Sequence, residues 1–179
     1  MKAIDTEYAG KYFRSRTEAR WAVFFDAIGV KWEYELEGYE LGDHIRYLPD
    51  FWFPEYKFFG EVKPTKVLTG MEKEKMMRLA KQSGYPVALF AGQPNGFPTL
   101  VFEWREAYES WDKEIVPAQF AWNADSDDPW LIVPFGAKAL EGPDKYDPFF
   151  WDCDEFVPEP GSLFDRAIRK ANMYRFEFK

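Results

Sequence analysis

Residues 46–64, RYLPDFWFPEYKFFGEVKP, hold the pattern on which the predicted fold depends. Polar and apolar side chains alternate over residues 45–53, and a second run of strand character covers residues 56–63. Pro54 and its polar neighbours favour a turn between the two runs. The sequence therefore predicts a β-hairpin at the centre of the fold.

Helices and further strands are predicted on both sides of this hairpin. Residues 14–29 carry an apolar stripe that ends at a glycine, which is typical of a helix, and residues 70–82 have a similar pattern. Residues 31–41 alternate as a strand does, and residues 86–91 form an apolar run typical of a buried strand. This order predicts an α/β fold with a mixed sheet and a helix on each face.

The chain is expected to divide near residue 104. Residues 1–104 form the predicted core, and residues 105–179 form an irregular, aromatic-rich and acidic extension packed on it. Within the extension, residues 130–135 and 146–151 are candidate short strands. Ser162 is a candidate N-cap for a short, basic, amphipathic helix.

The hairpin predicts a cluster of charged side chains. It would bring Asp50 beside Glu61, and the two-residue period of a strand places Lys63 on the same face as Glu61, while Val62 points into the core. Paired carboxylates are the ligands that Mg²⁺ prefers, and a bound ion with a nearby lysine suits phosphodiester hydrolysis. The backbone carbonyl of Val62 is a candidate further ligand.

Glu18 is a candidate fourth member of this cluster. It extends the apolar stripe of the first helix by one turn, and a carboxylate on a buried face is costly unless it is paired or bound to metal. The alternative is that Glu18 interacts with the helix N-terminus or with Arg14.

Composition limits the kinds of site and location. Cys153 is the only cysteine and His44 the only histidine, which excludes a Cys/His zinc cluster within the chain. We predict His44 to lie in a turn. The sequence shows no apolar leader and no long apolar run, so a cytoplasmic protein without membrane segments is expected.

The net charge of −8 is unusual for a protein that binds nucleic acid, but the acidic excess is local. Residues 1–91 hold 14 basic and 14 acidic side chains, residues 92–161 hold 4 and 15, and residues 162–179 hold 5 and 2. A phosphate-binding groove in the first half is therefore compatible with the composition. Seven basic residues are candidates for it, with Arg16 and Lys73 foremost: Arg14, Arg16, Arg20, Lys66, Lys73, Lys75 and Lys81.

Three motifs together resemble those of the PD-(D/E)XK nucleases, in particular the phage-encoded and transposase-associated enzymes whose first helix bears a glutamate. They are Y-x-G-x-x-F-R-S-R-x-E-A-R-W over residues 8–21, RYLPDF over residues 46–51 and EVKP over residues 61–64. With the helix and strand that follow, the resemblance covers residues 8–91.

The resemblance implies a restriction-endonuclease-like fold and a metal-dependent endonuclease acting on DNA, associated with a phage or mobile element. It implies that Mg²⁺ or Mn²⁺ is bound by Glu18, Asp50 and Glu61, and that Lys63 is catalytic.

Two other interpretations stay open. A carboxylate followed by E-x-K is common by chance in a charged chain, so the chain could be a non-catalytic binding or assembly module on a nuclease-like fold. It could also be an inhibitor whose acidic segment imitates DNA. The acidic half is, in addition, a candidate surface for a homodimer or a partner protein.

Overall fold

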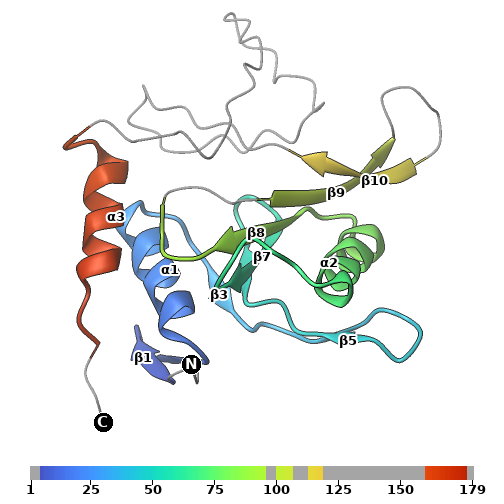
Figure 1. The fold of residues 1–179 in the computed structure, drawn as a ribbon, viewed down its shortest axis with the longest axis horizontal. Coiled ribbons are helices and arrows are strands. Elements are labelled where there is room, and N and C mark those ends of the chain that lie inside the picture. The colour runs from blue at the N-terminus through green and yellow to red at the C-terminus, as the bar shows by residue number, and fades with distance from the viewer. Residues whose placement is uncertain (1–4, 96–99, 107–112, 119–159, 177–179) are drawn as a thin grey trace, which may run out of the picture.

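The computed structural model describes residues 5–95, 100–106, 113–118 and 160–176. They form a mixed six-stranded sheet with helices on both faces, as predicted (Figure 1). Only β7 and β8 are parallel neighbours, and every other pair in the sheet is antiparallel. In spatial order the strands are β10 (Lys113–Ala118), β9 (Leu100–Glu106), β8 (Val87–Ala91), β7 (Phe58–Lys63), β6 (Phe51–Phe53) and β3 (Glu33–Tyr34).

Two small hairpins lie beside this sheet. The first joins β1 (Thr6–Tyr8) to β2 (Lys11–Phe13) directly before the first helix. The second joins β4 (Tyr39–Glu40) to β5 (Arg46–Tyr47). Asp43 and His44 have positive φ angles of 49° and 60° in the turn of the second hairpin, so His44 is a turn residue as predicted.

Helix α1 (Arg16–Ala27) covers one face of the sheet. Its N-cap is Ser15, whose hydroxyl accepts a hydrogen bond from the backbone N–H of Glu18. The helix ends before Gly29, which has a φ of 76°. Residues with a side chain rarely adopt this conformation, so glycine is favoured here. The predicted start and stop of this helix are therefore confirmed to within two residues.

Helix α2 (Gly70–Ser83) covers the opposite face and connects β7 to β8. A capping box begins it, because the side chains of Thr69 and Glu72 each accept a bond from the other's backbone N–H. Gly84 ends it in the left-handed conformation, with φ of 73°. This βαβ unit is the source of the one parallel pair in the sheet.

Each face of the sheet has its own apolar core. Alternate residues of β6, β7 and β8 point to α1, and the others point to α2. The α1 core includes Trp21, Phe24, Phe25, Phe51, Phe53, Phe58, Val62 and Phe90. The α2 core includes Tyr47, Phe59, Met76, Leu79, Val87, Leu89 and Phe102.

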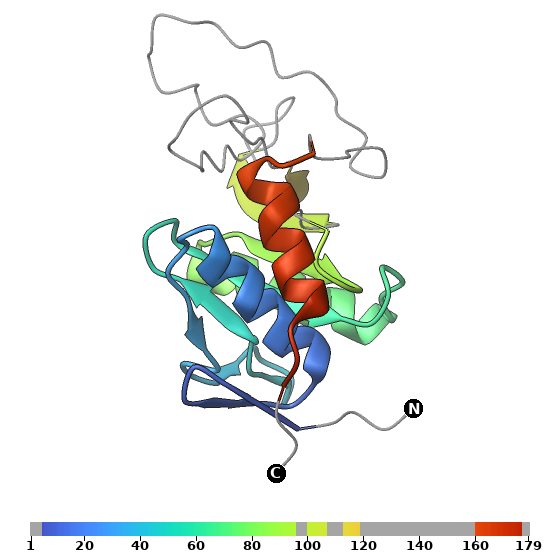
Figure 2. The same ribbon diagram turned by 90° about the vertical axis from the view of Figure 1, so that its left-hand side faces the viewer.

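Helix α3 (Leu163–Met173) lies along the outer side of α1 (Figure 2). Ser162 caps it, as predicted, by accepting a bond from the N–H of Asp165. Ala167 and Ala171 are buried against α1, and the ring of Phe164 lies 6.2 Å from that of Phe24. A segment from the end of the chain thus covers a helix from its beginning.

Three features of the fold differ from the sequence-based expectation. The strand predicted over residues 31–41 is broken, because Glu35 turns the chain with a φ of 46° and only β3 and β4 remain. The strand predicted over residues 45–53 is also broken, since Pro49 has no N–H to donate between β5 and β6. Strands β9 and β10 were not predicted and extend the sheet.

The domain division at residue 104 stays a prediction, and residue 104 itself lies within β9. The candidate strands at 130–135 and 146–151 lie outside the described residues. In the described part of the chain, no helix has the length and apolar character needed to span a membrane.

Gly60 is the point of closest packing in β7. A Cβ at this position would lie 2.9 Å from Phe53 Cε2 and 3.0 Å from Phe90 Cε2, inside a packed aromatic core. We expect Gly60→Ala to lower the free energy of unfolding by about 1–3 kcal/mol, because the rings must shift. Urea denaturation measures this change. Gly70→Ala is the control, since a Cβ there meets nothing within 4 Å, and an equal loss in both variants would contradict the steric explanation.

Candidate metal-binding site

The hairpin of β6 and β7 places Asp50 next to Glu61. Phe51 pairs with Gly60 in this hairpin, so the residues one step further on, Asp50 and Glu61, stand opposite each other on the same face. Both side chains are almost fully buried, with exposed fractions of 4% and 5%. Two carboxylates are therefore held close together away from water.

Both oxygens of Asp50 already accept hydrogen bonds. Oδ2 accepts a 2.7 Å bond from the backbone N–H of Val62, and Oδ1 accepts a 3.1 Å bond from Nη2 of Arg14. Burial raises the pKa of Asp50 well above its usual value, and the negative charges of Glu61 and Glu18 raise it further. The bond from Val62 and the charge of Lys63 oppose this shift without cancelling it. Burial and the neighbouring carboxylates therefore keep the pKa of Asp50 raised even though the Arg14 guanidinium lies against it.

Glu61 is held between a cation and a phenol. Lys63 Nζ lies 2.6 Å from Oε1 of Glu61, and the hydroxyl of Tyr47 donates a 2.8 Å bond to Oε2. Burial lowers the pKa of Lys63, but the carboxylates of Glu61, Asp50 and Glu72 outweigh burial and raise it overall. Lys63 is accordingly a charged ammonium in this structure.

Tyr47 was not identified from the sequence. It is buried, and burial together with the charge of Glu61 raises the pKa of its hydroxyl well above the usual value. The hydroxyl therefore stays protonated and acts as a hydrogen-bond donor to Glu61. Because Pro49 interrupts the alternation between β5 and β6, the sequence did not show which face Tyr47 occupies.

Glu18 lines the same pocket from the first turn of α1. Its Oε1 accepts a 2.7 Å bond from the hydroxyl of Ser15, and its Oε2 accepts bonds from the hydroxyl of Tyr34 at 2.6 Å and the backbone N–H of Arg14 at 3.1 Å. These contacts match the alternative in which Glu18 interacts with the helix N-terminus. They do not exclude a metal-binding role, since each carboxylate oxygen can accept more than one bond.

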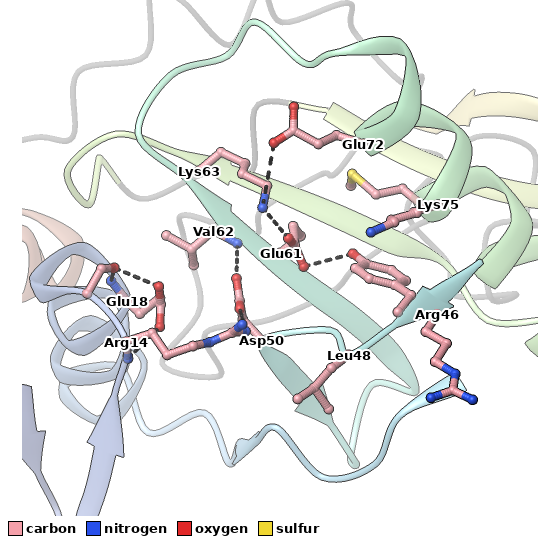
Figure 3. A pocket seen from close by; sticks show the side chains of 13 residues that line it. Arg14, Glu18, Arg46, Leu48, Asp50, Glu61, Val62, Lys63, Glu72 and Lys75 are labelled. Carbon is pink, nitrogen blue, oxygen red and sulfur yellow. Dashed lines mark hydrogen bonds and ion pairs between the residues drawn. The ribbon is translucent and has the colours of Figure 1, made fainter. Parts of the chain in front are cut away.

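These residues line an open pocket with a volume of about 490 Å³ (Figure 3). Five of its lining residues were predicted as site residues: Glu18, Asp50, Glu61, Val62 and Lys63. The predicted substrate contacts Arg16 and Lys73 are not among the lining residues, and Lys73 is exposed on the surface. The other charged residues of the lining are Arg14, Arg46, Glu72 and Lys75.

The donor set suits a hard divalent cation. Mg²⁺ and Mn²⁺ take oxygen ligands, and the pocket offers buried carboxylates without a histidine or cysteine. In β7, the backbone N–H of Phe59 donates to the carbonyl of Pro86, and the carbonyl of Lys63 accepts from the N–H of Gly92, so both residues face β8. The N–H of Val62 instead donates to the side chain of Asp50. The N–H and C=O of a strand residue point to the same side. The carbonyl of Val62 therefore faces the side of the strand where Asp50 lies, as a ligand would.

The carboxylates are not yet arranged as a coordination shell. Within the described residues, no three acidic, histidine or cysteine side chains come close enough together to hold a metal ion as they stand. Arg14 contacts Asp50 and Lys63 contacts Glu61, so side-chain cations fill part of the space between the acids. A metal ion would require these two side chains to move.

Comparison with known proteins gives no match to a family, to a curated protein or to a solved structure. The roles of the site residues therefore stay predictions that depend on the geometry of the pocket.

Proposed function

We propose that this protein is a metal-dependent nuclease of the PD-(D/E)XK type that hydrolyses phosphodiester bonds in DNA. The main support is the juxtaposition of Asp50 and Glu61, two buried carboxylates on one face of adjoining strands, with the pKa of Asp50 raised although Arg14 lies 3.1 Å from it. Structural carboxylates are normally paired so that their charge is stabilised. Two close carboxylates, one of which has a raised pKa, are typical of a site that binds a metal cation.

The position of each predicted site residue supports a specific role in this reaction. Asp50 and Glu61 would hold the ion, with the Val62 carbonyl and Glu18 at the side towards α1. A bound divalent ion supplies positive charge at the scissile phosphate and lowers the pKa of water. Lys63, charged and 2.6 Å from Glu61, would stabilise negative charge developing on the phosphoryl oxygens. Tyr47 would hold the Glu61 carboxylate in one orientation through its 2.8 Å bond.

A cleavage assay tests this proposal. Purified protein is incubated with linear duplex, single-stranded and branched DNA and with RNA, in Mg²⁺, in Mn²⁺ or in EDTA. We expect cleavage of at least one DNA substrate that requires the metal and falls by about 10²–10³-fold or more in Lys63→Ala, because the charge stabilisation is lost. If all substrates stay intact in both metals, the proposal fails, and cleavage of RNA alone would correct the substrate.

The closed ion pairs of the pocket favour a second candidate, a non-catalytic module. Arg14 Nη2 lies 3.1 Å from Asp50 and 2.5 Å from Glu35, and Lys63 bridges Glu61 and, at 3.8 Å, Glu72. A network of this kind can be purely structural. Thermal unfolding with added Mn²⁺ separates the two candidates, since a metal that binds the folded state raises its stability increasingly as the metal concentration exceeds Kd, and a structural network does not respond.

A further inference from the structure

The wall of the pocket next to α2 carries a lysine that pairs with no carboxylate of the described residues. Lys75 follows Glu72 by three positions, so both side chains lie on the helix face that lines the pocket. Within the described residues, Lys75 has no ion pair, although it is partly buried in a pocket that four acidic side chains also line. Figure 3 shows its ammonium group directed into the pocket. A partly buried ammonium without a partner is in a position to bind an anionic ligand.

Arg46 lines the rim of the same pocket from strand β5, with its side chain directed away from Lys75 (Figure 3). Its side chain is 83% exposed, and its 3.2 Å contact with Glu40 joins two exposed groups, so this ion pair stabilises little. The β4–β5 hairpin is fixed to α2, because Arg78 donates a 3.0 Å bond to the carbonyl of Leu41 and lies 2.8 Å from Asp43. Arg46 and Lys75 are therefore held by two elements that are fastened to each other.

The charge of the pocket explains how an acidic protein would attract phosphate here. The lining has four basic side chains, Arg14, Arg46, Lys63 and Lys75, and four acidic ones, Glu18, Asp50, Glu61 and Glu72, so their formal charges cancel. A bound divalent ion would make the pocket positive. Arg14 lies on the α1 side of the carboxylates, and Arg46 and Lys75 lie on the α2 side (Figure 3).

We infer that Lys75, inside the pocket, and Arg46, at its rim, contact two separate phosphates of the nucleic-acid strand. The inference rests on the proposed function and adds the residues that position its substrate. A lysine and an arginine that line the same pocket as the carboxylates would fix the backbone of the strand without reading its sequence. They replace Arg16 and Lys73 as the main candidates for substrate contact.

Binding of a short fluorescein-labelled DNA duplex tests this inference. The assay uses the full chain carrying Lys63→Ala, which blocks cleavage and keeps the carboxylates, and measures fluorescence anisotropy in Mg²⁺ at several salt concentrations. Removing one phosphate contact lowers the slope of log K against log salt by about 0.9, which is about an eightfold weaker binding at 0.1 M salt. We expect this effect from Arg46→Ala and from Lys75→Ala, each added to Lys63→Ala, and about twice that slope change when both are added.

Two comparison variants make the outcome specific. Lys73→Ala lies on the same helix outside the pocket, and Lys31→Ala lies beyond the other end of α1 in an exposed pair with Glu55. Both should leave the slope unchanged. Equal weakening by Lys73→Ala and Lys75→Ala would overturn the inference, as would unchanged binding in Arg46→Ala and Lys75→Ala. If the chain without these substitutions neither cuts nor binds DNA in Mg²⁺, the proposed function itself fails.

Discussion

Asp50→Asn is expected to abolish cleavage and, at the same time, to stabilise the metal-free protein. The amide oxygen of asparagine can still accept the bond from the Val62 N–H, so the strand pairing is kept. It cannot supply the charge that holds a divalent ion, so the cleavage rate should fall by about 10³-fold or more. The substitution also removes a buried charge that Glu61 and Glu18 repel. It removes the ion pair with Arg14 as well, but Arg14 keeps its second partner, Glu35.

The sign of the stability effect follows from the pKa of Asp50. Because the pKa is higher in the folded than in the unfolded protein, the folded state loses stability as the pH rises from about 4 through the raised pKa. Asp50→Asn removes this loss. Without metal, the variant should melt at or above the temperature of the unsubstituted protein at neutral pH, and its melting temperature should depend less on pH.

Differential scanning fluorimetry between pH 4 and 8, with and without Mn²⁺, measures both effects. The unsubstituted protein should be stabilised by Mn²⁺ and the variant should not. Asp5→Asn is the control, since Asp5 is exposed and lies outside the pocket. A variant at Asp50 that retains more than a tenth of the activity, or melts well below the unsubstituted protein without metal, would contradict this account.

Trp21→Ala is expected to cause the largest loss of stability. Trp21 is fully buried and its ring lies 4.8 Å from Phe90 and 5.5 Å from Phe24, so it joins α1 to the sheet. Truncation to alanine costs about 3–5 kcal/mol of the free energy of unfolding. The whole fold is stabilised by only about 5–15 kcal/mol. The melting temperature should fall by roughly 6–20 °C.

Two further variants separate packing from hydrogen bonding at Trp21. The indole Nε1–H donates a 3.0 Å bond to the carbonyl of Gly92, so Trp21→Phe loses this bond but keeps an aromatic ring. It should cost about 1–3 kcal/mol. Leu36→Ala, at a side chain that is 55% exposed, should cost less than about 0.5 kcal/mol. Circular dichroism melts test all three, and a Trp21→Ala variant as stable as Leu36→Ala would show that α1 is not held by this contact.

The periodic elements of the fold were predictable from the sequence, and the interrupted ones were not. Helices α1 and α2 have apolar stripes and glycine stops, strand β8 is an apolar run and strand β7 follows a clear turn signal, so local patterns are sufficient for them. Strands β3 and β5 have two residues each. Glu35, with its positive φ, follows β3 directly, and Pro49 lies between β5 and β6. The pairing of these short strands depends on tertiary contacts that alternation does not reveal.

The candidate site divides in the same way. Asp50, Glu61 and Lys63 were found because the hairpin period alone brings them to one face. Tyr47 and Arg14 contact these carboxylates from outside the hairpin, across connections whose geometry depends on how the elements pack. Among the basic residues, helical position was a weak guide, because Lys73 and Lys75 are two steps apart on α2 and only the fold shows which of them faces the pocket.

The position of α3 against α1 has a consequence for synthesis on the ribosome. Helix α1 is translated well before the residues that cover its outer side, which include Phe164, Ala167 and Ala171. At about 5–20 residues per second, roughly seven to thirty seconds pass between the synthesis of α1 and the synthesis of α3. The nascent chain therefore lacks this cover on an apolar helix face during that interval, and a chaperone that binds such faces is expected to act on it then.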